Sequence, residues 1–313
     1  MISLRRLAAP HRYDFVGTLA ALRPLGGDPS IRLSAAELWW ATRTPDGPGT
    51  LHLLRAGDEL QAQGYGPGAE WVVDQSDAVA GLRDDVTPFE PLAAAHPVVR
   101  RIWHQHPGRR MARSGRLFPL LVPTILGQKV SGKEAARSFH QVARRFGEPA
   151  PGPLPGLLLP ADPDAVAASP YWLFHPFGIE QRRADALRRV AAVAGRLESA
   201  PDAAAATAAL VAIPGIGHWT AAEVVRVAFG DPDAVTVGDY NLPHVVVFAF
   251  TGAPRAGSRE SAPGRLSPAD TRMLELLEPF RGQRARVCDL VMTSGPHPPR
   301  FGPRMTIRSF ARF

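Results

Sequence analysis

The chain has 313 residues, 45% hydrophobic and 21% charged, which is typical of a globular protein with two or three compact units. No run approaches the roughly 18 apolar residues of a membrane span, and the first residues lack a signal-peptide core, so we expect a cytoplasmic protein that contacts no membrane. The single cysteine, Cys288, excludes an internal disulfide and a four-cysteine cluster or zinc site. We therefore predict no metal site and interpret Cys288 as a small buried residue.

The charge balance is basic, with 36 Lys and Arg against 29 acidic residues and a net charge of +7. A basic surface suits a polyanion such as DNA, but many cytosolic enzymes of this size carry a similar charge. Lysine occurs only at Lys129 and Lys133, and the other basic residues are arginines. A GC-rich genome explains this excess of arginine. The scarcity of lysine nevertheless restricts which amines could form covalent intermediates.

Residues 1–92 have the composition of short strands separated by turns, typical of a small antiparallel sheet. Residues 34–44 are ambiguous, because their Ala and Leu content also favours a helical turn. The predicted strands lie within 11–19, 51–57, 60–66 and 70–75.

From about residue 93 the periodicity becomes helical and predicts a mostly α-helical remainder. The predicted helices lie within 96–106, 117–147, 162–169, 181–199, 202–213, 218–230, 271–280 and 284–294. Residues 253–266 are the most loop-like stretch and are compatible with disorder. Residues 295–313 are rich in Pro and Arg and form either a tail on the surface or a basic arm that touches phosphate.

The most informative segment is a helical hairpin within residues 210–244. An Ala-rich helix stops at Pro214-Gly215-Ile216-Gly217, and a second helix starts at once with His218. The two glycines permit positive φ and close backbone approach, and the second helix presents unpaired N–H groups with the positive end of its dipole. Such a helix start binds phosphate oxygens. A plain helix-helix turn is the alternative for this motif taken alone.

A carboxylate follows the hairpin at about twenty residues' distance, where the apolar run 234–237 leads into Gly238 and Asp239. With this spacing the sequence resembles the helix-hairpin-helix DNA glycosylase superfamily, and most closely its 3-methyladenine DNA glycosylase II type. Two further segments match the family in order: 126–131, which reads LGQKVS, and 178–187, which contains a glycine and an Arg-Ala helix start.

The resemblance implies an α+β protein: a β-rich domain over 1–92, a helical domain built from 93–116 plus 234–313, and a second helical domain over 117–233. It implies a monomer that binds double-stranded DNA with a damaged base, extrudes the nucleotide and hydrolyses its N-glycosidic bond. We expect that no cofactor is required. The family resemblance also implies a monovalent cation bound at the hairpin carbonyls.

Asp239 is the expected catalytic residue, because a fixed carboxylate stabilises the oxocarbenium-like sugar and can orient or deprotonate the attacking water. The alternative is a turn or cap residue. Family members that also nick the strand carry a Schiff-base lysine two residues after the second hairpin glycine, where this chain has Trp219. We therefore expect no lyase activity. Trp219 either stacks on a cationic alkylated base or packs in the core.

Other positions carry over from the family with open roles. Lys129 falls where the family has an apolar wedge, so it either fills the vacated stack or contacts phosphate. Glu223 stands one turn after Trp219 and either favours cationic bases or is simply solvated. The predicted base contacts are Trp219, Gln128, Tyr240 and Glu223. The predicted DNA contacts are Pro214, Gly215, Ile216, Gly217, His218, Thr220, Lys129 and Ser131.

Two other functions remain open from the sequence. A glycosylase for oxidised or mismatched bases is disfavoured by the absence of the hairpin lysine and of a four-cysteine cluster. A non-catalytic helix-hairpin-helix DNA-binding or repair-scaffold protein would use the hairpin in the same way and leave Asp239 with a structural role only.

Overall fold

The structure of the chain, a computed structural model, describes residues 2–255 and 266–299. Most of the loop expected at 253–266 and most of the segment 295–313 lie outside the described residues, so the expectations for them stay predictions. Within the described ranges, no helix is long and apolar enough to cross a bilayer.

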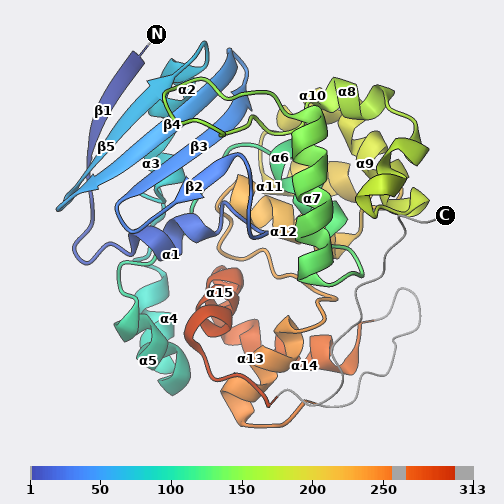
Figure 1. The fold of residues 1–313 in the computed structure, drawn as a ribbon. Coiled ribbons are helices and arrows are strands. Elements are labelled where there is room, and N and C mark those ends of the chain that lie inside the picture. Colours follow the sequence, from blue (N-terminus) through green and yellow to red (C-terminus); the bar gives the residue numbers. More distant parts are fainter. Residues whose placement is uncertain (1, 256–265, 300–313) are drawn as a thin grey trace.

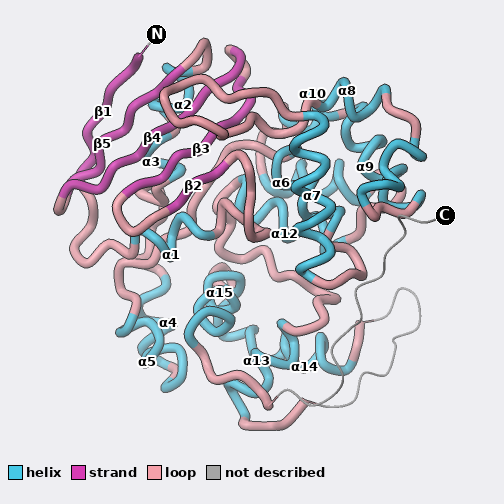
Figure 2. Tube along the Cα trace, viewed as in Figure 1, coloured by secondary structure: helices cyan, strands magenta, loops and turns pink. Residues whose placement is uncertain are grey.

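The N-terminal part is a five-stranded antiparallel sheet, coloured blue in Figure 1 and magenta in Figure 2, with strand order β1-β5-β4-β3-β2. Its strands are β1 (Ile2–Ala8), β2 (Ile31–Leu33), β3 (Glu37–Thr44), β4 (Gly47–Ala56) and β5 (Glu59–Tyr65). β5 alternates between buried and more exposed residues, as a strand with one face on the core should. The predicted α+β class with a small N-terminal antiparallel sheet is confirmed, although β1 and β2 were not among the predicted strands.

The prediction of a strand over 11–19 is wrong, because this segment contains most of the helix α1 (Phe15–Ala20). The Asp14 carboxylate accepts a hydrogen bond from the Gly17 amide at 2.9 Å and caps the helix start. Because a side-chain cap satisfies an amide that has no partner in the first turn, it favours helix over a strand of the same apolar content.

The segment 70–75, also predicted as a strand, lies almost entirely in α2 (Ala69–Asp74). Val72 and Val73 are buried there, and α2 packs on β1, β4 and β5. Packing against the sheet thus outweighs the β propensity of the valines. The ambiguous segment 34–44 is a strand rather than a helical turn, because most of it forms β3, which pairs with β2 and β4.

The rest of the described chain is helical. Its elements are α3 (Ser76–Val79), α4 (Phe89–Ala95), α5 (Pro97–Gln105), α6 (Phe118–Leu126), α7 (Gly132–Phe146), α8 (Pro163–Ala168), η1 (Tyr171–Phe177), α9 (Gln181–Ala192), α10 (Ala194–Glu198), α11 (Ala203–Val211), α12 (His218–Ala228), α13 (Leu242–Thr251), α14 (Pro268–Leu277), η2 (Glu278–Phe280) and α15 (Arg284–Ser294).

The segment 117–147, predicted as one helical stretch, is two helices, α6 and α7. The chain turns between them with Lys129 in the left-handed region at φ 55°, and Ser131 caps α7 by accepting from the Glu134 amide. α4 and α13 were not predicted, because both are short and apolar and lack a clear helical stripe.

Two hydrophobic cores organise these elements. The first joins the sheet to the helices from α6 through α12. The second gathers α4 and α5 with α13, α14 and α15, which are far apart in the sequence and lie together in the lower half of Figure 1. The segment after α12 therefore passes from one core to the other. The expected domain boundaries stay a prediction.

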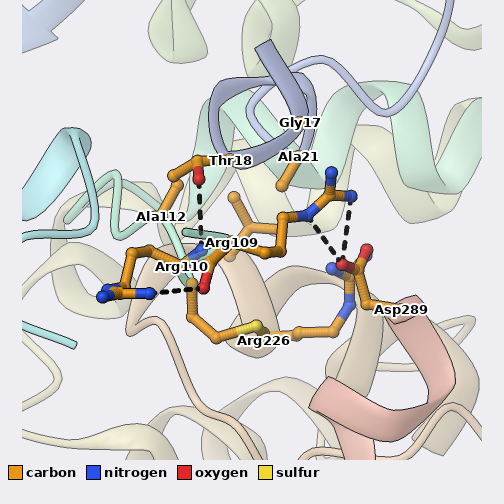
Figure 3. Close-up of a pocket in the computed structure, with 10 residues that line it drawn as sticks. Gly17, Thr18, Ala21, Arg109, Arg110, Ala112, Arg226 and Asp289 are labelled. Atoms are coloured by element: carbon orange, nitrogen blue, oxygen red, sulfur yellow. Dashed lines mark hydrogen bonds and ion pairs between the residues drawn. The ribbon is translucent and has the colours of Figure 1, made fainter. Parts of the chain in front are cut away.

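Charged groups fill the boundary between the cores. Arg109 reaches both Asp14, at 3.1 Å, and Asp289 on α15, at 3.1 Å. Figure 3 shows Arg109 pointing toward Asp289 beside a cavity of about 10 Å³, and Arg110 beside Thr18. This small cavity lies within a structural ion network.

Candidate functional site

The hairpin lies between α11 and α12, with Ile213 and Ile216 buried in the first core. Pro214, Gly215, Gly217 and His218 are exposed. Gly217 precedes α12 and has no side chain with which to cap it. The first amides of α12 therefore keep the anion-binding character expected of a helix start.

Only one hairpin glycine adopts positive φ. Gly215 has φ 98°, whereas Gly217 has φ −104°, so the expectation of positive φ applies to Gly215 alone. A Cβ at Gly215 would also lie 2.8 Å from the Cβ of Ala186 on α9. The close approach of the hairpin to α9 therefore requires glycine at this position.

Gly215→Ala is expected to lower the free energy of unfolding by about 1–3 kcal/mol, since both the backbone conformation and the contact with Ala186 become strained. Gly217→Ala is the matched control, because a Cβ there meets no atom within 4 Å. Urea unfolding of both variants measures the difference. Equal stabilities would contradict the role given to Gly215.

Side chains from α9 and from the turn between α6 and α7 hold the carbonyl side of the hairpin. The Gln128 amide donates to the Gly215 carbonyl at 3.1 Å and to the Thr220 hydroxyl at 2.9 Å. Arg189 donates to the Pro214 carbonyl at 3.2 Å. Gln128 lies in the turn between α6 and α7, so this turn and the hairpin form one surface. Lys129, the next residue, is exposed on it.

The predicted DNA contacts differ in exposure. The side chains of Thr220 and Ile216 are buried, so a contact by either residue would use its backbone. Ser131 is partly exposed and its hydroxyl is occupied as the cap of α7.

The Asp239 carboxylate is held by three N–H donors. Its Oδ1 accepts from the amides of Asn241 and Leu242, both at 2.7 Å, at the start of α13. Its Oδ2 accepts from the indole N–H of Trp219 at 3.1 Å. Asp239 is partly exposed. One oxygen thus serves as the cap that the alternative interpretation expected, while the other joins Asp239 to the hairpin helix α12.

Trp219 is also only partly buried, and its hydrogen bond ties it to Asp239. The sequence suggested that both residues belong to one site but not that they bond directly. The spacing of 20 residues along the chain carries no signal for such a contact.

The loop before Asp239 has no regular secondary structure and depends on two other carboxylates. Thr236 is buried and donates to Glu223 on α12 at 2.6 Å, and Glu223 also pairs with Arg226 at 3.4 Å. The Gly238 amide, at φ 85°, donates to Asp270 on α14 at 2.9 Å. Neither Thr236 nor Asp270 was predicted as a site residue.

Tyr240 is the most exposed aromatic residue near the carboxylate, at 66%. The Arg255 guanidinium lies 4.2 Å from the ring centroid and donates to the Tyr240 carbonyl at 3.0 Å.

Two groups in this half of the molecule have shifted pKa values. The pKa of His244 on α13 is lowered, first by partial burial and second by the positive charge of Arg255. Cys288 is buried, as expected, and burial raises the pKa of its thiol to about 12.

A larger cavity lies elsewhere, next to β2 and β3, and has a volume of about 550 Å³. Trp39 and His140 line this cavity, and Asp239 and Trp219 line neither it nor the cavity of Figure 3. Within residues 2–255 and 266–299, no group of three potential metal-ligating His, Cys, Asp or Glu side chains gathers.

No protein-family model matches the chain. The chain is 30% identical over 153 residues to a probable bifunctional transcriptional activator/DNA repair enzyme AlkA of Mycobacterium tuberculosis, in each of two strains. This match covers 47% of the chain and 30% of the relative, so it spans less than a third of that protein's length.

Solved structures resemble the chain over nearly its whole length. A 3-methyladenine DNA glycosylase from Archaeoglobus fulgidus has a TM-score of 0.71 and 17% identity, covering 92% of this chain and 97% of its own. An 8-oxoguanine glycosylase/lyase from Clostridium acetobutylicum has a TM-score of 0.66 and 10% identity, covering 93% and 98%. The chain therefore has the fold of these solved glycosylases, an N-terminal five-stranded antiparallel sheet followed by a mostly helical region.

Proposed function

We propose that this chain is a monofunctional DNA glycosylase, active as a monomer, that removes alkylated bases from double-stranded DNA by hydrolysing the N-glycosidic bond. The observation that carries the proposal is the Asp239 carboxylate, fixed by Trp219 to the helix whose N-terminus forms the hairpin. A phosphate bound by the hairpin amides would thereby lie at the start of the helix to which the carboxylate is hydrogen-bonded.

In this proposal the hairpin holds the bent phosphodiester while the nucleotide leaves the stack. Breaking the bond to the base develops positive charge at C1′ of the sugar, and a fixed negative oxygen beside C1′ stabilises that charge. Because protein N–H groups already orient Asp239, little reorganisation is required when the charge develops. The same carboxylate can orient the attacking water.

Trp219 supports the choice of alkylated bases. Its N–H is occupied by Asp239, but the ring faces remain suited to stacking. A base alkylated on a ring nitrogen is cationic, and stacking on an indole face adds roughly 0.5–2 kcal/mol of cation–π attraction. The name of the Mycobacterium tuberculosis relative, a DNA repair enzyme, agrees with a function in DNA repair.

The position of the lysines supports hydrolysis without strand cleavage. A lyase requires an amine that reaches the sugar to form a Schiff base. Lys129 lies in the turn before α7 and Lys133 in the first turn of that helix, whereas the hairpin position used by family lyases holds Trp219.

A monovalent cation at the hairpin carbonyls stays part of the proposal. The carbonyls of Pro214 and Gly215 accept from Arg189 and Gln128, and each oxygen has a second lone pair with which it would bind the ion. Its role would be to support the phosphate contact, and the chemistry at the sugar would need no cofactor.

The decisive experiment incubates the purified chain with methylated duplex DNA and analyses the strands with and without alkali. We expect strand breaks at damaged purines only after alkali, because hydrolysis leaves an intact abasic strand. Breaks without alkali would show lyase activity. Binding of the duplex with no strand breaks even after alkali would support the DNA-binding or scaffold alternative. In either case the affinity for DNA should fall steeply with salt concentration.

A further inference from the structure

Asp270 is a buried carboxylate that the proposed mechanism does not use. It is 4% exposed and lies in the first turn of α14. Its Oδ2 accepts from the Ser267 hydroxyl at 2.6 Å, and the Ser267 hydroxyl oxygen in turn accepts from the Asp270 amide at 3.0 Å. This pair caps α14, and it leaves Oδ1 for another donor.

That second oxygen contacts the catalytic loop rather than its own helix. Oδ1 accepts from the Gly238 amide at 2.9 Å, across 32 residues of sequence. Gly238 has φ 85° and directly precedes Asp239. The amide nitrogen that donates to Asp270 is therefore bonded directly to the Gly238 Cα, where the backbone has positive φ immediately before Asp239.

The loop forms no ladder or helical hydrogen bonds. Its earlier part is held by Asp233, which accepts from the Gly282 and Arg284 amides at 2.8 and 3.0 Å, and by Thr236 on Glu223. Next to Asp239, the Gly238 amide is fixed by Asp270. Asp270 holds the later part from α14, in the second core, while Trp219 holds the carboxylate itself from α12, in the first. Hydrogen bonds to an ionised acceptor are among the stronger ones in proteins, so loss of this bond should let the backbone at Gly238 move.

We propose that Asp270 is a positioning residue, which sets the location of the Asp239 carboxylate by fixing the Gly238 amide. This inference rests on the proposed glycosylase function. Misplacement of a catalytic group by about 1 Å costs on the order of a hundredfold in rate, so a weakened anchor next to Asp239 should slow the chemical step. Binding of DNA by the hairpin does not involve this bond and should persist.

The test compares Asp270→Ala with Asp270→Asn by single-turnover excision at saturating methylated duplex, with the DNA Kd measured separately. Asp270→Ala should lower the rate at least about tenfold with the Kd changed less than about twofold. Asp270→Asn should recover most of the rate, because its amide oxygen still accepts from Gly238. Asp162→Ala is the matched control, since Asp162 caps the remote helix α8 by accepting from the Ala165 amide at 3.0 Å.

A spectroscopic readout separates this proposal from the function on which it rests. The indole ¹H–¹⁵N signal of Trp219, assigned with Trp219→Phe, reports the bond to Asp239 and should shift in Asp270→Ala. It should stay unchanged in Asp162→Ala. If the wild-type chain excises nothing, the proposed function fails, and the indole signal still decides whether Asp270 sets the carboxylate.

Two results would overturn the positioning role. One is an Asp270→Ala variant with the wild-type rate and an unshifted indole signal. The other is equal loss of activity in Asp270→Ala and Asp162→Ala, which would mean that losing a helix cap accounts for the effect. If Asp270→Ala does not fold, Asp270→Ser provides the shortened side chain, and the expected order of rates is wild type, then Asp270→Asn, then Asp270→Ser.

Discussion

Asp239→Asn is expected to bind damaged duplex DNA like the wild type and to excise bases at least about a hundredfold more slowly, as seen when fixed charge stabilisation is removed from other active sites. The asparagine oxygen can still accept from the amides of Asn241 and Leu242, so the start of α13 stays capped. What disappears is the negative charge beside the sugar. The asparagine amide nitrogen would also face the Trp219 N–H, so two donors would meet and the hydrogen bond to Trp219 would be lost.

The measurement is single-turnover excision from a methylated duplex, with affinity determined in parallel. Asp46→Asn is a suitable control: it makes the same change in charge at an exposed position in the turn between β3 and β4. Normal excision by Asp239→Asn would remove the mechanism proposed here. Loss of DNA binding together with activity would instead assign Asp239 a structural role in the hairpin surface.

Local sequence patterns were sufficient to locate the hairpin and the loop that follows it. Pro214 and two glycines end one helix and begin another, and this signal for a turn depends only on neighbouring residues. The carboxylate at 239 stands out for a similar reason, since it follows a short apolar run and a glycine. The pattern did not establish that Asp239 and Trp219 bond, because such a contact depends on how the loop returns to α12.

The error at α2 and the missed role of Asp270 share a physical origin in tertiary contacts. α2 reads as a strand until the sheet beneath Val72 and Val73 is known. Asp270 reads as an ordinary helix-capping partner of Ser267, and the sequence gives no hint that its second oxygen reaches Gly238. Contacts across 32 residues between a loop and a helix start have no periodicity from which they could be predicted.

The stability of the boundary between the two cores should depend strongly on Arg286. This residue on α15 is 1% exposed, and its guanidinium donates to both oxygens of Asp84, at 2.9 and 2.6 Å. Asp84 also accepts from the Met111 amide at 2.8 Å. The pair therefore connects α15 with the segment between α3 and α4 and, through the Met111 amide, with the segment between α5 and α6.

Arg286→Ala should lower the free energy of unfolding by about 3–5 kcal/mol, because it leaves the Asp84 carboxylate buried without its countercharge. The exposed pair of Arg281 with Glu278 is the control, and Arg281→Ala should cost less than about 1 kcal/mol. Urea unfolding measures both. Similar losses in the two variants would contradict a special role for the buried pair.

The double variant Asp84→Asn/Arg286→Met separates the charge from the packing. If the cost of Arg286→Ala comes from an uncompensated charge, removing both charges should restore much of the lost stability, since a buried ion pair contributes little beyond what well-packed neutral groups provide. If the cost comes from lost packing of Arg286 over the Phe89 ring, whose centroid lies 5.5 Å from the guanidinium carbon, methionine should restore it even with Asp84 intact. Comparing Arg286→Met with the double variant therefore distinguishes electrostatic from apolar stabilisation of the boundary that the catalytic loop must cross.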